Sequence, residues 1–253
     1  MKLLLIFFLF LKGHYTFADE FPNLFGCFCE GGLITGVAGK NDKILIDGVE
    51  IKTFENGEFI FAFGRKYKDT IKVKFNDKLK IFNIKKKKYK IERINGLPKK
   101  KVEPSKEDFK RIIKDKEKIS LSKKVGEKKK LFDKKFILPV NGRLSGVFGS
   151  QRILNSKPRR PHYGIDIAQK KGAPVIAPSS GKVKLVDYGM FFTGNTIVLD
   201  HGLGLMSIFA HLEDIFVEEG QKIKIGEKIG SVGMTGRATG PHLHWGIYLE
   251  KKP

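Results

Sequence analysis

Two pairs of residues in the carboxy-terminal half of this chain have the types and spacing of metal ligands. The first pair is His242 and His244, which alternate around Leu243. In a β-strand both imidazoles would project from one face, ~6.8 Å apart along the backbone. Two histidines placed in this way can bind one ion, or one can bind while the other acts beside it. The pattern alone is a weak signal, because two such histidines can also be ordinary surface groups.

The second pair is His162 and Asp166, four residues apart. The intervening Gly164 disfavours a helix, and in a straight strand the two residues would be ~13 Å apart. They can share an ion only if His162 lies on a loop that bends back over Asp166. Pro158 and Pro161 favour such a bend just before the strand.

The remaining histidines of this half are His201 and His211. His211 ends a run with strand periodicity, in which alternation predicts one face with Met206, Ile208, Ala210 and Leu212 and another with Ser207, Phe209 and His211. His201 follows Asp200 in a glycine-flanked turn, which favours a histidine that is hydrogen-bonded within the turn.

The elements that position these side chains are predicted to be β-strands. Residues 136–253 show no long helical periodicity, and we expect an all-β domain built on an antiparallel sheet. The strands with the clearest signals are Val183–Asp187, Thr196–Asp200, Leu205–Leu212 and His242–Leu249. Residues 175–183 and 223–230 are predicted to form two hairpins.

Residues 26–95 predict a small β-sandwich-like module. Short alternating segments are separated by turn residues, and the predicted strands are Lys43–Asp47, Glu58–Phe63, Thr70–Phe75 and Leu79–Ile84. The only two cysteines, Cys27 and Cys29, exclude a disulfide-stapled scaffold. In a strand they would be ~6.8 Å apart, so we expect two unpaired small apolar side chains rather than a disulfide.

Residues 96–135 predict a basic helical linker. Pro104 breaks the β pattern, and Ser105 with Asp108 forms a weak capping box. The apolar positions at helical spacing are Phe109, Ile112, Ile113 and Ile119. Such a stripe favours a connector that docks on a neighbouring domain over a helix that lies on anionic lipid.

The charge of the chain is concentrated in its middle. The 253 residues carry 49 Lys and Arg against 27 Asp and Glu, a net charge of +22, and residues 65–135 hold 29 of the basic and 10 of the acidic residues. Anionic envelope polymers, a membrane surface or a lysine-rich composition without function would each explain this. No base-reading motif accompanies the charge, so nucleic acid is not the expected partner. The composition excludes a wholly disordered chain and a multispan membrane protein.

The first residues predict export. Met1 and Lys2 precede an apolar run from Leu3 to Leu11, and Ala18 ends a candidate cleavage site. This is the layout of a secretory signal peptide over residues 1–18, and the run is too short to span a membrane. An uncleaved anchor is the alternative. Either would place the protein in the periplasm or the cell envelope.

Together these motifs resemble the M23 family of zinc metallopeptidases, the lysostaphin- and LytM-like peptidoglycan endopeptidases. The resemblance covers roughly residues 136–250. Its matching stretches are Pro139–Gly149, His162–Asp166, Asn195–Gly202, Phe209–Leu212 and Gly233–Trp245. The amino-terminal region is more weakly similar to the leader module of some Gram-negative members.

The resemblance implies a function and a role for each site residue. His162, Asp166 and His244 would be the ligands of one zinc ion per chain. His211 and His242 would be catalytic histidines beside the metal, with the general base not assigned between them. The substrate would be a cross-linking peptide of peptidoglycan, hydrolysed in cell-wall remodelling.

Two other functions remain open at this stage. Some members of the family have lost zinc ligands and act as binding modules that activate cell-wall amidases. Here all three ligand positions and both further histidines are present, which favours the enzyme. A basic structural protein that binds envelope polymers or nucleic acid would bind no zinc, and its binding would depend steeply on salt.

Overall fold

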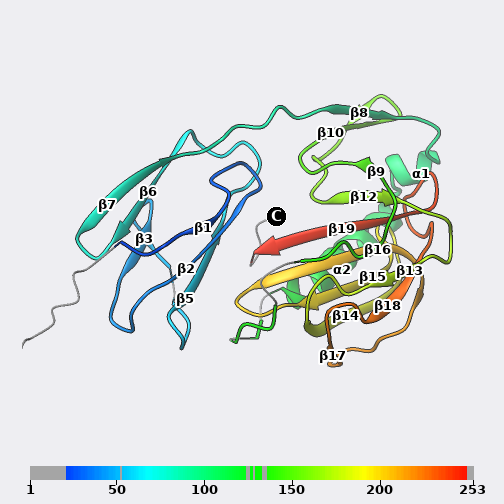
Figure 1. The fold of residues 1–253 in the computed structure, drawn as a ribbon. Helices are drawn as coiled ribbons and strands as arrows, with labels where there is room; N and C mark the ends of the chain where they lie inside the picture. Colours follow the sequence, from blue (N-terminus) through cyan, green and yellow to red (C-terminus); the bar gives the residue numbers. More distant parts are fainter. Residues whose placement is uncertain (1–20, 52, 124–125, 128, 133–135, 250–253) are drawn as a thin grey trace, which may run out of the picture.

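The computed structural model describes residues 21–249 except residues 52, 124–125, 128 and 133–135. The described part consists mostly of β-strands, in an amino-terminal module and a carboxy-terminal sheet domain joined by a linker with helices (Figure 1). This confirms the predicted fold class. The predicted signal peptide, residues 1–18, lies outside the described residues. No helix in the described ranges has the length and apolar character needed to cross a bilayer.

The amino-terminal module packs two small sheets around one core (Figure 1). One sheet contains β1 (Phe25–Gly26), β2 (Leu33–Val37) and β5 (Glu58–Ala62), and the other contains β4 (Val49–Glu50), β3 (Ile44–Ile46), β6 (Thr70–Phe75) and β7 (Lys78–Asn83). Side chains of both sheets, including Ile34, Phe59 and Ile71, fill the space between them. The predicted strands of this region are confirmed, because alternating apolar residues need a partner sheet to cover them.

The expectation of unpaired cysteines is wrong: Cys27 and Cys29 form a disulfide. Their Cα atoms are 5.2 Å apart, closer than residues two apart in an extended strand. The amide of Cys29 donates a hydrogen bond of 2.8 Å to the carbonyl of Cys27, so the chain turns tightly here instead of running straight. The prediction failed because it assumed extended backbone.

The strand β8 (Ile91–Ile94) leaves the module and pairs with the carboxy-terminal half. It lies parallel to β10 (Gln151–Leu154), which also pairs with β11 (Lys157–Pro158). Residues 91–94, at the end of the segment predicted as the module, therefore belong by hydrogen bonding to a small sheet beside the carboxy-terminal domain (Figure 1).

The linker contains α1 (Lys99–Val102) and α2 (Lys106–Ser122). Ser105 caps α2: its hydroxyl accepts from the amide of Asp108 at 3.2 Å, and the Asp108 carboxylate accepts from the amide of Ser105, which confirms the predicted capping box. Helix α2 packs on β14 of the carboxy-terminal sheet.

The predicted apolar stripe of α2 is only half buried. Ile112 is 2% exposed, and Ile119 packs against a buried cluster that includes Leu185 and Met206. This confirms the docked connector. Phe109 and Ile113, in contrast, are 52% and 53% exposed, because they lie on the flank of α2 away from the sheet. The lipid alternative for that flank stays a prediction.

The carboxy-terminal domain is a large antiparallel sheet with the order β17-β14-β15-β16-β19-β12-β9, to which β18 and β13 are added beside β16. Its strands are β9 (Arg143–Gly146), β12 (Ile165–Ala168), β13 (Pro174–Ile176), β14 (Gly181–Met190), β15 (Gly194–Asp200), β16 (Leu205–Ile215), β17 (Lys222–Ile223), β18 (Lys228–Val232) and β19 (His242–Leu249). The four strands with the clearest sequence signals are confirmed.

The two predicted hairpins are wrong. Strand β13 pairs with β18 and β14 pairs with β17, so residues 175–183 and 223–230 pair with each other and not within themselves. Turn residues mark where the chain reverses, but they do not show which strand lies alongside.

The two faces of the large sheet pack against different parts of the chain. Leu243 and Trp245 belong to the main core on one face. His242 and His244 alternate with them, so they face the opposite side, where α2 covers the part of the sheet around β14. The site lies on the part of this same face that α2 does not contact, over β16, β19 and β12.

Candidate metal centre

Strand pairing places the first two candidate ligands side by side. Asp166 on β12 lies directly opposite His244 on β19 in the antiparallel register. Residues opposite each other in such a pair share a face of the sheet. The His244 Nδ1 and Asp166 Oδ1 atoms are 2.9 Å apart. Pairing between strands almost eighty residues apart in the sequence thus brings two of the three candidate ligands together.

His162 joins them from the loop before β12, as the sequence predicts. Its backbone is held on both sides, since the Gly149 amide donates to its carbonyl at 2.7 Å and its own amide donates to the Ser150 carbonyl at 2.9 Å. The His162 Nε2 atom lies 3.0 Å from Asp166 Oδ1. The bent loop brings together two residues that a straight strand would keep apart.

Three ligand atoms converge on one point. His162 Nε2 and His244 Nδ1 are 2.8 Å apart, and one atom from each of His162, Asp166 and His244 lies within 4.8 Å of the others. His162 and Asp166 are 4% and 5% exposed. Two imidazoles and a carboxylate are a donor set that suits zinc, with a fourth position for water or substrate.

The protonation of the cluster suits a cation. Burial raises the pKa of Asp166, but its contacts with the His162 and His244 imidazoles outweigh burial and hold the pKa far below its usual range. Burial lowers the pKa of His244, against the opposing hydrogen bond to Asp166. The carboxylate is therefore ionised and the His244 imidazole is favoured in its neutral form, which are the states that metal ligands require.

His211 reaches the site through an irregularity in β16. Its φ of 64° lies in the left-handed region, and the pairing of β15 with β16 shifts register there. The His211 ring lies 4.7 Å from the ring of His242 and 6.2 Å from that of His244, centroid to centroid.

This corrects the predicted faces of the strand, because regular alternation fails at the shift. Leu212 shares the main core with Phe209, whereas Met206 and Ile208 pack on the side of α2. The extra residue turns His211 from the face of Phe209 to the face that carries the candidate metal ligands.

Backbone carbonyls fix the tautomers of the two further histidines. The His211 Nδ1 atom lies 2.8 Å from the Thr235 carbonyl oxygen, and His242 Nδ1 lies 2.8 Å from that of Gly240. A carbonyl can only accept, so each Nδ1 carries the hydrogen and each Nε2 is left as an acceptor in the neutral ring. Burial, with repulsion from His242 and His244, lowers the pKa of His211 to about 3.

His201 has no part in this cluster. It is fully buried, its Nδ1 donates to the Ser180 carbonyl at 2.8 Å, and its Nε2 accepts from the Ser207 hydroxyl at 2.8 Å. The predicted hydrogen-bonded histidine is found, but its partners lie outside its own turn.

Two contacts of the site carry no signal in the sequence. The Arg152 guanidinium on β10 forms an ion pair with Asp166 Oδ2. Gly164 lies so close to His244 that a Cβ there would meet His244 Cε1 at 2.7 Å and the Trp245 carbonyl oxygen at 2.6 Å. Arg152 lies outside the ligand motifs and Gly164 lies between two of the ligands, but only the folded chain shows the contacts that these two residues make.

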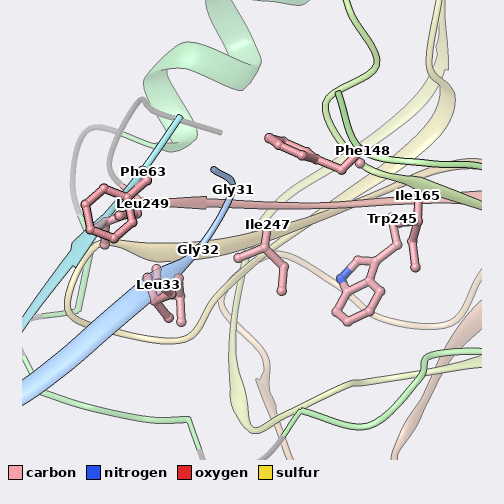
Figure 2. Close-up of a pocket in the computed structure, with 12 residues that line it drawn as sticks. Gly31, Gly32, Leu33, Phe63, Phe148, Ile165, Trp245, Ile247 and Leu249 are labelled. Atoms are coloured by element: carbon pink, nitrogen blue, oxygen red, sulfur yellow. The ribbon is translucent and has the colours of Figure 1, made fainter. Parts of the chain in front are cut away.

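A cavity of about 250 Å³ lies beside the site but does not contain it. Its apolar walls come from the amino-terminal module, through Leu33 and Phe63, and from the carboxy-terminal domain, through Phe148, Trp245 and Ile247 (Figure 2). None of the five site residues named from the sequence lines it. The cavity therefore marks the junction of module and domain.

Comparisons with known proteins show similarity to peptidases. Residues 160–253 match the model of peptidase family M23. Over 112 residues the chain is 38% identical to the peptidoglycan DD-endopeptidase ShyA of Vibrio cholerae, which is 44% of this chain and 26% of that protein. It is 41% identical over 91 residues to an uncharacterized metalloprotease of Haemophilus influenzae, which is 36% of this chain and 19% of that protein. The chain thus spans about a quarter or less of the length of these two relatives.

A solved structure extends the similarity to the amino-terminal module. A Pseudomonas aeruginosa protein assigned to peptidase M23 superposes with a TM-score of 0.63 at 28% identity, covering 87% of this chain and 89% of that one. Such coverage exceeds the carboxy-terminal half, so both parts of the fold are shared. Residues 160–253 thus match a peptidase M23 domain in sequence, and the described fold resembles that of a protein assigned to this family.

Proposed function

We propose that this chain is an exported zinc-dependent endopeptidase of the cell envelope that hydrolyses cross-linking peptide bonds in peptidoglycan. The observation that carries the proposal is the convergence of His162, Asp166 and His244 on one point, with His211 and His242 beside them. ShyA, named a peptidoglycan DD-endopeptidase, supports the substrate class. The apolar run at residues 3–11 supports export.

His162, Asp166 and His244 would hold one zinc ion per chain. Bound zinc supplies a Lewis acid that polarises a peptide carbonyl and activates water near neutral pH. The donor set fits this ion, because His162 Nδ1 donates to the Val147 carbonyl at 3.2 Å and so leaves Nε2 as the free ligand atom.

His211 and His242 would move the protons of the reaction. Each presents an Nε2 acceptor on the metal side of the sheet, while its Nδ1 is tied to a carbonyl. One can accept a proton from the attacking water, and the protonated ring can give a proton to the leaving amine. The intact ligand set gives no support to the amidase-activating alternative.

The test is zinc stoichiometry of the purified chain together with digestion of peptidoglycan sacculi. The wild type is expected to bind one zinc and to release cut cross-links. His244→Ala should lose both, because it removes a ligand. His242→Ala is the matched control: it should keep the zinc but cleave about 100-fold more slowly or worse, because it removes a proton-transfer group.

Two results would contradict the proposal. A wild type without zinc would overturn the metal site and the enzyme with it. Bound zinc with intact sacculi would overturn the substrate but leave the metal site in place.

A further inference from the structure

The two carboxylate oxygens of Asp166 have different partners. Oδ1 faces the imidazoles, with His162 Nε2 at 3.0 Å and His244 Nδ1 at 2.9 Å. Oδ2 is bound by the Nη2 atom of Arg152. One carboxylate oxygen of Asp166 therefore faces the other candidate metal ligands, and the second oxygen binds a guanidinium.

Arg152 is itself held by a residue of strand β8. It pairs in register with Glu92 across the parallel strands β10 and β8, and its Nε atom lies 3.4 Å from Glu92 Oε2. Both side chains of this ion pair are 21% exposed, so solvent only partly screens the interaction. The planar guanidinium can bind two carboxylates at once, which a lysine ammonium cannot do with the same geometry.

Gly146 leaves the space that this arrangement needs. It lies opposite Asp166 in the pairing of β9 with β12. A Cβ at this position would meet Asp166 Oδ2 at 2.5 Å and Arg152 Nη2 at 3.1 Å. The strand beside Asp166 thus has no side chain where the guanidinium reaches the carboxylate.

We propose that Arg152 is a positioning residue for the metal ligand Asp166, and that Glu92 of β8 holds Arg152 in place. This inference rests on the metal site of the proposed function. The terminal torsion of an aspartate is broad, so a carboxylate bound on one oxygen alone can rotate. With Oδ2 held by Arg152, only Oδ1 is directed at the metal position.

Positioning and charge make opposite contributions to zinc affinity. A guanidinium close to the ligand repels a divalent cation, and the negative charge of Glu92 offsets part of that repulsion. If charge alone mattered, removing Arg152 would strengthen zinc binding. If positioning dominates, removing it weakens binding, as losing a group that orients a metal ligand commonly does, by about 10- to 100-fold. Whether zinc affinity rises or falls when Arg152 is removed therefore separates the effect of charge from the effect of positioning.

The experiment measures the zinc dissociation constant of the full chain by competition with a chromophoric chelator. The variants are Arg152→Gln, Arg152→Lys and Glu92→Gln. Glu103→Gln is the matched control, because Glu103 pairs with Lys157 of the same small sheet and does not contact Asp166. The visible spectrum of the cobalt-substituted chain reports coordination, and circular dichroism reports folding.

Arg152→Gln is expected to weaken zinc binding about 10- to 100-fold with an altered cobalt spectrum. Arg152→Lys should also bind more weakly, because it keeps the charge but loses the planar fork. Glu92→Gln should show a smaller loss, and Glu103→Gln none.

Unchanged or tighter binding in Arg152→Gln would overturn the inference, as would full affinity in Arg152→Lys. If Arg152→Gln fails to fold, the zinc affinities of Arg152→Lys and Glu92→Gln test the inference instead. In either case the wild type still binds zinc, so the proposed function stands. A wild type that binds no zinc would overturn both proposals.

Discussion

Three site histidines, His162, His211 and His242, donate their Nδ1 hydrogen to a backbone carbonyl oxygen. In each case the loop or strand that supplies the carbonyl also sets which nitrogen faces the cluster. The chemistry of these side chains therefore depends on backbone positions that have no side-chain signature. The position of the His244 ring likewise depends on a residue without a side chain, because Gly164 packs closely against it.

Gly164→Ala is expected to displace the His244 ring and to weaken zinc binding, because the added Cβ would lie 2.7 Å from His244 Cε1. Gly64→Ala is the matched control, since a Cβ there meets nothing within 4 Å. Zinc affinity of both variants, measured by chelator competition, checks the prediction. Equal affinity in Gly164→Ala and the wild type would show that the ring can give way at no cost.

The buried His201 predicts a loss of stability in mild acid. Burial lowers its pKa to about 4 from the ordinary value of 6.5. Between these values the unfolded chain binds a proton that the folded chain does not, so the free energy of unfolding falls as pH drops from about 6.5 towards 4. The loss approaches about 3 kcal/mol for this one group.

Urea unfolding of the metal-free chain at about pH 7.5 and about pH 5 measures this effect. His201→Gln keeps a donor for the Ser180 carbonyl and an acceptor for Ser207 but cannot titrate, so its stability should fall less over the same pH change. An equal fall in both proteins would contradict the assignment.

At the scale of elements, α2 divides its apolar residues between a docked and an exposed flank. Ile112 is almost fully buried, whereas Phe109 is 52% exposed. Periodicity predicts a helix with an apolar stripe but not how much of the stripe a neighbour covers, because the covering surface is made by β14 and its neighbours.

Ile112→Ala is expected to lower the free energy of unfolding by about 2–4 kcal/mol, because it leaves a cavity under α2. Phe109→Ala, on the same helix, should change it by about 0.5 kcal/mol or less. Denaturant unfolding of the full chain compares the two. Similar losses in both variants would mean that the exposed flank is covered in solution.

Over the whole molecule, the amino-terminal module packs directly on the domain that carries the site. Ile60 of β5 forms a buried cluster with Leu203 and Leu205. The Arg65 Nε atom donates to the Gly149 carbonyl at 2.6 Å, and the amide of Gly149 donates to the carbonyl of His162. The module thus contacts the segment that holds one of the candidate ligands.

Ile60→Arg is expected to separate the module from the domain, because it places an unpaired charge in an apolar contact. Small-angle X-ray scattering should then show a larger radius of gyration than the wild type. Ile81→Arg is the matched control, since Ile81 on β7 is 59% exposed and its replacement should leave the radius unchanged. An unchanged radius in Ile60→Arg would show that other contacts hold the interface.

Features that depend on near neighbours along the chain could be predicted from the residues alone. The alternation of His242 with Leu243 places the two histidines of β19 on one face, and Ser105 with Asp108 begins α2. The bend that brings His162 to Asp166 also follows, because Gly164 disfavours the helix that would bring the two side chains together and a straight strand would keep them apart. Side-chain periodicity and capping act over a few residues, so they can be read along the chain.

Features that join residues distant in the sequence became visible only in the folded chain. The pairing of Asp166 opposite His244, the register shift that turns His211 to the site and the contact of Glu92 with Arg152 all join separate segments. The hairpin predictions failed for the same reason, since strand partners are chosen by the packing of the whole sheet. Because the free energy of such pairings comes from surfaces that exist only after folding, no local pattern encodes them.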